Sequence, residues 1–236
     1  MVSILRIYYV ANTYYDLCFY MAQILNNAGK RVAVEDVSDG SLLTELIPDM
    51  DGQEIWTYKG VDYVRGELCD CDVYDIVITN CDIYYLINRL VKDKAGAEAS
   101  YDARPVIVYN SDLGKHDVSN MCSIAKCNPV NVIVRDVISD NMGISYIKKK
   151  IQHMCDRSEE LSECITYYVS NMDIIDYRYR IDMEYEGYTQ FDNLSWGYGK
   201  MITGLMTDIT GYDRKELWHA FRHAREGKII ENSSVG

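Results

Sequence analysis

The feature that most constrains the fold of this chain is a regular alternation of short apolar runs with helix-like stripes over its first 155 residues. After the first run, Leu17, Met21 and Ile24 recur at the spacing that places side chains on one helix face. Near-continuous apolar strands that alternate with helices are typical of a parallel sheet with helices on both faces. The sequence therefore predicts an α/β fold with a doubly wound, mostly parallel sheet. The apolar runs are residues 3–10, 31–36, 73–79, 104–109 and 131–137.

The last third of the chain has a different texture, rich in tyrosine and charge. Residues 163–171 indicate one more strand, whereas residues 194–209 and 214–228 carry helical patterns. No long linker and no internal repeat separates these segments from the preceding ones. We therefore predict an α/β core over residues 1–160. Residues 161–236 are expected to form a C-terminal strand and helical extension packed on the same domain.

Charge and composition narrow the function. The chain has 236 residues and a net charge of −12, which argues against nucleic acid as a partner because such binding needs clustered cations. No stretch approaches the roughly twenty apolar residues of a membrane span. The N-terminus MVSILRIYYV enters a strand pattern without a signal-peptide layout. Four of the eight cysteines, Cys18, Cys122, Cys155 and Cys164, lie in helical or apolar stretches, as reduced buried thiols do. We therefore expect a cytoplasmic protein.

Two groups of residues have side chains of metal-binding types. Cys69, Cys71 and Cys81 lie close together, but this spacing lacks the second cysteine pair or the histidine of a typical zinc site. His219 and His223 would share one face of a helix, yet no acidic or cysteine partner matches them. The sequence therefore predicts no metal site.

Four segments together resemble one protein family. They are ILNNAGKRVAVED (24–36), YDIVITN (74–80), VNVIVRDV (130–137) and DYRYRIDMEYEGYTQFDNLSWGY (176–198). In their order and spacing they resemble the ParA/MinD group of P-loop ATPases, which have a deviant Walker A loop, and within it the CpaE/TadZ branch associated with pilus assembly and polar localisation. The resemblance covers roughly residues 3–155.

The resemblance places the phosphate-binding loop of the family on residues 10–16. Its Gly-Lys-Thr-Thr motif would fall on Thr13, Tyr14, Tyr15 and Asp16. A P-loop needs glycines to wrap the backbone around phosphates, a lysine for their charge and a hydroxyl for Mg²⁺. None of these stands at the matching position, and Asp16 adds a negative charge where a triphosphate would lie.

At two further positions, this sequence also lacks an acidic residue that the family carries. The aspartate at the end of the second strand remains as Asp36, but the aspartate two residues later is replaced by Ser38, with Asp39 adjacent. The Walker B aspartate would fall on Asn80, a neutral amide that lacks the anionic oxygen preferred by the hydrated Mg²⁺ ion. Hydrolysis of ATP by the mechanism of the family is therefore not expected.

The residues themselves suggest what the turn now does. Thr13 and Asp16 fit a capping box, with Thr13 as the N-cap and Asp16 at the third helical position. In such a box the protein itself satisfies the N–H groups that a phosphate would bind. We interpret the turn as a structural joint. Without the resemblance, the same residues describe an ordinary capped turn of an α/β domain.

The last helical segment allows two interpretations. Leu217 and Phe221 would form an apolar face beside Arg222 and Arg225, as in a helix that lies on a membrane surface. MinD-type proteins carry such a membrane-targeting helix near their C-terminus. The same pattern arises when a helix packs on its own domain, and the acidity of the chain favours packing.

The leading hypothesis is a non-catalytic, ParA/MinD-like scaffold or localisation protein without a cofactor, in a pilus or cell-envelope assembly system. The resemblance implies a homodimer. The 21 tyrosines indicate partly solvated surfaces, which are suited to binding a protein partner. The alternative is a divergent ATPase switch that still binds ATP with Mg²⁺ through a rebuilt loop. A small-molecule-binding α/β domain is a third reading.

Overall fold

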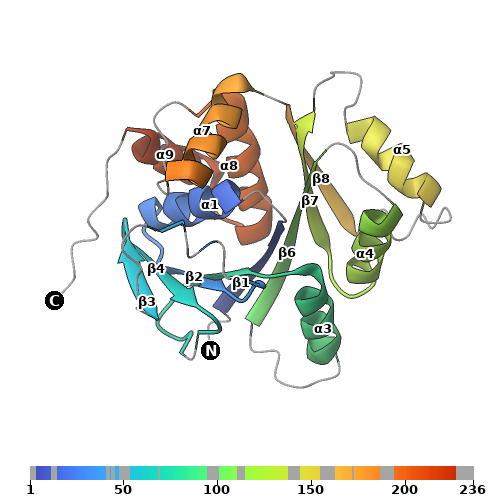
Figure 1. The fold of residues 1–236 in the computed structure, drawn as a ribbon, viewed down its shortest axis with the longest axis horizontal. Helices are drawn as coiled ribbons and strands as arrows, with labels where there is room; N and C mark the ends of the chain where they lie inside the picture. Colours follow the sequence, from blue (N-terminus) through green and yellow to red (C-terminus); the bar gives the residue numbers. More distant parts are fainter. Residues whose placement is uncertain are drawn as a thin grey trace.

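The protein, represented by a computed structural model, is built on one eight-stranded sheet among its described residues (Figure 1). The structure describes residues 4–11, 15–40, 43, 46–47, 54–68, 70–94, 101–110, 115–137, 144–154, 163–171, 173–186 and 194–226. The strands are β1 (Ile4–Ala11), β2 (Val32–Asp36), β3 (Ile55–Tyr58), β4 (Val61–Arg65), β5 (Ile76–Asn80), β6 (Tyr101–Asn110), β7 (Val130–Val137) and β8 (Ile165–Asn171). The helices are α1 (Tyr15–Asn27), α3 (Ile83–Lys94), α4 (Lys115–Ala125), α5 (Ile144–Met154), α7 (Ile174–Glu186), α8 (Trp196–Thr210) and α9 (Arg214–Arg225).

The strand order is β3-β4-β2-β5-β1-β6-β7-β8. Every neighbouring pair is parallel except β3 and β4, which form an antiparallel hairpin. The hairpin turns at Lys59 and Gly60, whose φ angles of 49° and 79° suit the tight turns of hairpins. The predicted α/β fold, with a mostly parallel sheet and C-terminal helices, is confirmed.

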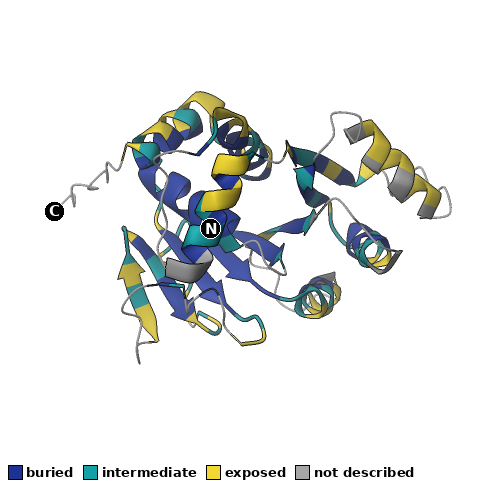
Figure 2. Cartoon of the chain, turned by 45° about the horizontal axis from the view of Figure 1, so that its top comes forward, coloured by how far each residue is buried: buried dark blue, intermediate teal, exposed yellow. Residues whose placement is uncertain are grey.

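Helices cover both faces of the sheet, so the molecule has two apolar cores. On β1, Ile7 and Tyr9 belong to the core under α1, α8 and α9, whereas Tyr8 and Val10 belong to the core under α3 and α4. This alternation follows from the two-residue period of a strand. In Figure 2 the central strands and α1 are buried while the outer faces of the surrounding helices are exposed.

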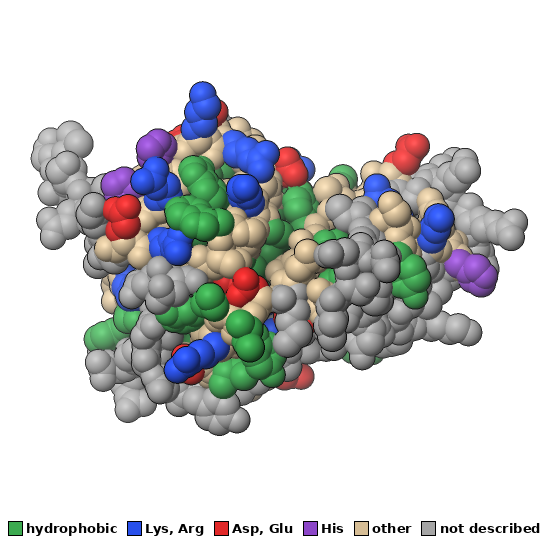
Figure 3. All heavy atoms as spheres, turned by 90° about the horizontal axis from the view of Figure 1, so that it is seen from above, with side chains coloured by type: hydrophobic (Ala, Val, Ile, Leu, Met, Phe, Trp, Pro, Cys, Tyr) green, Lys and Arg blue, Asp and Glu red, His purple; other side chains and the backbone are tan. Residues whose placement is uncertain are grey.

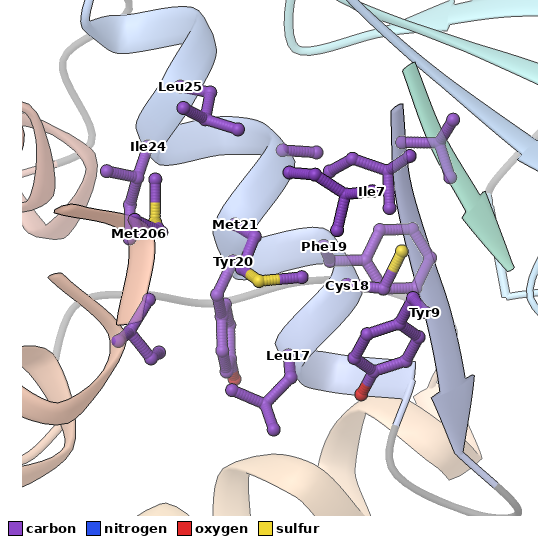
Figure 4. Packing of buried hydrophobic residues seen from close by; sticks show 14 of the residues in the cluster. Ile7, Tyr9, Leu17, Cys18, Phe19, Tyr20, Met21, Ile24, Leu25 and Met206 are labelled. Atoms are coloured by element: carbon purple, nitrogen blue, oxygen red, sulfur yellow. The ribbon is translucent and has the colours of Figure 1, made fainter. Parts of the chain in front are cut away.

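Helix α1 is the most enclosed helix of the described chain. Every residue from Asp16 to Asn27 is buried, because the sheet lies on one side of the helix and α8 and α9 contact it on the other. Figure 4 shows Tyr20 and Ile24 of α1 facing Met206 of α8, with Cys18 on the side of β1. A helix covered on all sides belongs to the core, so the side chains of its first turn are surrounded by protein.

The C-terminal helices α8 and α9 complete this layer. Ser195 caps α8, and Asp213 caps α9 by accepting from the N–H groups of Lys215 and Glu216. Leu217 and Phe221 of α9 are buried, so the apolar face of the last helix packs on the protein, as favoured. The boundary at residue 160 remains a prediction. Within the described parts of the chain, no helix is both long and apolar enough to cross a membrane.

One expectation about the cysteines is wrong. Cys122 of α4, predicted to be a reduced thiol, is disulfide-bonded. Cys18 and Cys81 are free and buried, and Cys71 is free and half-buried. Apolar surroundings indicate burial of a cysteine but not whether it has a partner, so the sequence could not distinguish these cases.

Candidate functional site at the start of α1

The predicted site residues that the structure describes gather at the carboxyl ends of three neighbouring strands. Asp36 ends β2 and Asn80 ends β5, and the two are register partners. Helix α1 begins just beyond β1, the next strand in the sheet. Tyr15 is the first residue of α1 and is half-buried. Thr13 and Tyr14 lie outside the described residues, so the capping box remains a prediction.

Asp16, in the first turn of α1, is the centre of a buried polar cluster that we call the α1 site (Asp16, Arg135 and Tyr198). The Nη1 atom of Arg135 lies 2.6 Å from Oδ1 of Asp16. The hydroxyl of Tyr198 donates to Oδ2 of Asp16 over 2.9 Å. The side chains of Asp16 and Arg135 are 1% and 2% exposed. Both carboxylate oxygens therefore have partners inside the protein.

Charge in the α1 site is balanced from three directions. Burial alone would lower the pKa of the Arg135 guanidinium, but the Asp16 carboxylate beside it keeps that pKa well above its ordinary value. The guanidinium carbon also lies 5.0 Å from the centre of the Tyr198 ring, in cation–π contact. A carboxylate in a first helical turn faces the positive end of the helix dipole. Asp16 thus occupies the kind of position that phosphate takes in nucleotide-binding folds.

At the end of β7, the side chains of Arg135 and Asp136 contact different helices on the same side of the sheet. The pairing of β7 with β8 shifts in register between Val134 and Val137, and Asp136 has a left-handed φ of 56°. In a regular strand, successive side chains point to opposite faces, and a bulge redirects them. Arg135 consequently reaches α1, while Asp136 accepts from Arg180 of α7 over 2.8 Å.

Two more tyrosines border the α1 site. Burial, followed by the nearby Asp16 carboxylate, raises the pKa of Tyr9 and of Tyr20 well above the ordinary value. The rings of Tyr20 and Tyr198 meet edge to face, with their centres 6.0 Å apart. In Figure 4 the Tyr20 and Tyr9 side chains extend from α1 and β1, respectively. These neutral phenols fill space around the ion pair and exclude water from it.

A second polar cluster surrounds Asp36. The Oδ1 atom of Asp36 accepts from Nδ2 of Asn80 over 2.8 Å and from the Ser38 hydroxyl over 2.5 Å. Its Oδ2 atom accepts from the backbone N–H of Leu43 over 3.0 Å. Asn80 is 1% exposed, and its Oδ1 atom has no hydrogen-bond partner. Asp36 thus holds the loop after β2, and Asn80 carries the unsatisfied acceptor of this cluster.

The structure therefore brings Asp36, Ser38 and Asn80 together and engages Asp16 in a different cluster. Sequence reasoning missed Arg135 and Tyr198, the two partners of Asp16. One signal for Arg135 was present, because an arginine inside the apolar run NVIVRDV must find an acid if that strand is buried. No comparable signal marks Tyr198 among 21 tyrosines.

The described residues contain no group of three or more histidine, cysteine or acidic side chains that could hold a metal ion. Cys81 is buried and Cys71 half-buried, whereas Cys69 lies outside the described residues. His219 is exposed and His223 half-buried on α9. At the α1 site, the charged side chains of Asp16 and Arg135 pair with each other. The arrangement is suited to holding elements together.

Comparison with known proteins gives one informative result. No family model and no curated protein matches the sequence. Among solved structures, the MinC:MinD cell division protein complex of Aquifex aeolicus matches with a TM-score of 0.53 and 12% identity, over 89% of this chain and 97% of that chain. FtsY of Mycoplasma mycoides matches with a TM-score of 0.41 and 14% identity, over 79% of this chain and 68% of that chain. At these identities the likeness concerns the fold alone, which is similar to that of MinD in this complex.

Proposed function

We propose that this protein is a non-catalytic, ParA/MinD-like scaffold or localisation protein of the cytoplasm. The observation that carries the proposal is the ion pair of Asp16 with Arg135 at the start of α1. In a nucleotide-binding member of this fold, the corresponding helix end would face phosphate. Here a side chain of the protein supplies the negative charge, and Arg135 neutralises it.

Three losses at the nucleotide positions support the absence of catalysis. The loop at residues 10–16 has neither glycine nor lysine. The carboxylate of Asp16 would repel a triphosphate at this helix end. Asn80 replaces the acid that would order the shell of Mg²⁺, and its amide nitrogen donates to Asp36. A pseudo-ATPase without a cofactor accounts for all three.

Partners are proposed on two grounds. The MinD structure that this fold matches is a complex with MinC, which supports a protein partner for this chain. The sequence resemblance to the CpaE/TadZ branch supports work in a pilus or cell-envelope assembly system, and it implies a homodimer. The packed apolar face of α9 argues against that helix as a membrane anchor. The net charge of −12 argues against nucleic acid.

One observation favours a second candidate, a divergent nucleotide switch that binds ATP with Mg²⁺. The Oδ1 atom of Asn80 is buried without a partner beside Asp36 and Ser38. An unsatisfied buried acceptor costs about 1–3 kcal/mol, and a hydrated cation or a bound ligand would satisfy it. The Walker B position would then remain a ligand site.

Calorimetric titration with ATP and Mg²⁺ separates the two candidates. The scaffold proposal predicts no heat of binding up to millimolar ATP, and no release of phosphate. A Tyr14→Gly/Tyr15→Lys variant, titrated alongside, restores a glycine and a lysine to the loop and reports whether the loop alone blocks binding. Saturable, Mg²⁺-dependent heat from the unaltered protein would overturn the proposal in favour of the switch.

A further inference from the structure

The starts of α7 and α8 form an exposed apolar surface with a basic rim, which we call the α7–α8 patch. Its apolar members are Ile174, Ile175, Tyr177 and Trp196, which are 80%, 47%, 36% and 49% exposed. Its rim carries the cationic side chains of Arg178, Lys200 and Arg225, and it also includes Asp173, next to Ile174, and Asp182, next to Arg178. Figure 3 shows Lys and Arg side chains gathered around hydrophobic ones on this side of the molecule. Grouped exposed apolar side chains with a polar rim are typical of interaction sites.

Hydrogen bonds and a cation–π contact hold the two halves of the α7–α8 patch in place. The Asp176 carboxylate of α7 accepts from the backbone N–H and the hydroxyl of Ser195, the cap of α8, over 2.7 and 2.6 Å. The Arg225 guanidinium lies over the Trp196 ring, with 4.2 Å between the guanidinium carbon and the ring centre. The patch is thus held in place before any partner arrives, which lowers the entropy cost of binding.

The opposite face of the sheet carries a loop of complementary character, which we call the acidic loop (Glu67, Asp70, Asp72 and Val73). All four side chains are exposed, and Val73 is 50% exposed. Within the described part of this connection, from Gly66 to Asp75, no lysine or arginine offsets the acids. The acidic loop combines an exposed aliphatic side chain with carboxylates, whereas the α7–α8 patch combines exposed apolar side chains with cations. The two surfaces are therefore complementary in charge.

A buried ion pair fixes the acidic loop to the sheet. Glu35 of β2 pairs with Arg6 of β1 over 2.7 Å, and its other oxygen accepts from the backbone N–H of Leu68 over 2.9 Å. Arg6 also donates to the sulfur of Cys71 over 2.9 Å. Arg6 points away from the core of its neighbour Ile7, so the loop lies across the sheet from α8.

We propose that the α7–α8 patch binds the acidic loop of a second copy of this chain, in a head-to-tail contact. Complementary charge on one molecule is the argument for this occupant. A symmetric contact of patch with patch would place the rims of Arg178, Lys200 and Arg225 against each other, and like charges in an interface are unfavourable. In a head-to-tail contact, one molecule uses its patch and the other uses its loop. The free loop of the first and the free patch of the second can each bind a further copy, so the assembly can grow into a chain.

The size and charge of the two surfaces determine how strong the contact should be and how it should respond to salt. Four apolar side chains and one short loop suit a small, transient interface rather than an obligate one. Exposed charges are screened by salt, so association should weaken about tenfold or more between 50 and 500 mM NaCl. Arg178 already lies 3.8 Å from Asp182 on its own helix, but at 82% exposure it can turn towards a partner.

Sedimentation velocity with two charge variants tests the proposal. The patch variant is Arg178→Glu/Lys200→Glu, and the loop variant is Asp70→Asn/Asp72→Lys. Asn is chosen at position 70 because the Asp70 side chain accepts from the backbone N–H of Asp72. Exposed residues elsewhere supply controls of equal charge change. These controls are Lys92→Glu/Lys149→Glu for the patch and Asp102→Asn/Glu163→Lys for the loop.

The unaltered protein and both controls should grow beyond a dimer as concentration rises at low salt. Each variant alone should show no such growth and should keep the size of its smallest species, which is a monomer or the homodimer of the proposed function. An equimolar mixture of the two variants should associate again, because each variant supplies the intact surface that the other lacks. Growth of the loop variant alone with concentration would show a symmetric contact of patch with patch and overturn the proposal. A constant size of the unaltered protein at every concentration would overturn it as well, and would leave the ATP titration unaffected.

Discussion

At the scale of single residues, the ion pair of Asp16 and Arg135 is the least expected feature of the protein. Both side chains are almost completely buried, 119 residues apart in sequence. Removing two charges from water is costly, and a buried pair offsets this cost only with good geometry and further hydrogen bonds. The Tyr198 hydroxyl supplies one such bond to Asp16. The pair therefore specifies where β7, α1 and α8 meet rather than adding much net stability.

Breaking the pair from one side should destabilise the fold strongly. Arg135→Met leaves the Asp16 carboxylate buried without its countercharge, and we expect a loss of about 3–5 kcal/mol in the free energy of unfolding. Urea denaturation followed by circular dichroism measures this loss.

The matched control removes both charges. Asp16→Leu/Arg135→Met should recover most of the stability, because a buried ion pair can often be replaced by apolar residues at little cost. Additive losses in the double variant would show that the two charges do not depend on each other, contrary to the structure.

At the scale of elements, sequence patterns predicted most strands and helices because local periodicity sets them. The helical stripe that begins at Leu17 lies in α1, and the strand predicted at residues 163–171 is β8, which spans Ile165–Asn171. The patterns could not predict that α1 would be buried on all sides, because α8 and α9, which cover it, come more than 160 residues later. The pairing of Asp16 with Arg135 likewise depends on where a register shift ends β7.

Contact between α8 and α9 gives a sharp element-scale prediction. A Cβ atom at Gly199 would lie 2.3 Å from the ring of Phe221, so Gly199→Ala should force the two helices apart. We expect a loss of about 1–3 kcal/mol in the free energy of unfolding, although alanine favours helix more than glycine does.

Gly204→Ala, in the same helix, is the matched control. A Cβ atom there would meet no atom within 4 Å, so this change should stabilise by up to about 1 kcal/mol through helix propensity alone. Chemical denaturation of both variants measures the difference. Equal effects of the two substitutions would contradict the packing of Phe221 against α8.

At the scale of the whole molecule, the order of the strands in the sheet could not be predicted from the sequence. The apolar runs predicted parallel strands, but periodicity holds no information on which strands become neighbours. The structure places β1 between β5 and β6, which brings the ends of β2 and β5 beside the start of α1. Asp36 and Asn80 could be assigned to one site beforehand only through the family resemblance.

Buried tyrosines make the whole fold sensitive to alkali. Burial raises the pKa of four phenols well above 10, namely Tyr9, Tyr20, Tyr63 and Tyr198. Above pH 10 the unfolded chain releases these protons while the folded chain keeps them, so stability falls as pH rises. Four such groups cost roughly 5 kcal/mol per pH unit.

The fold should therefore unfold cooperatively within about two pH units above 10. Tyrosinate absorbance and circular dichroism, recorded on one sample during the titration, should change together. Smooth ionisation of all tyrosines with unchanged circular dichroism through pH 12 would contradict their burial.

We propose that the Asp16 carboxylate takes the place of phosphate at the start of α1, and chemical rescue tests this replacement. Asp16→Ala removes the carboxylate that pairs with Arg135 in the first turn of α1, so the variant should lose stability, and added phosphate should restore part of it. The measurement is the thermal midpoint of the variant and of the unaltered protein against millimolar phosphate, with chloride at equal ionic strength as the control. We expect the thermal midpoint to rise with phosphate for the variant only. An equal rise in the unaltered protein, or none in the variant, would contradict the proposal.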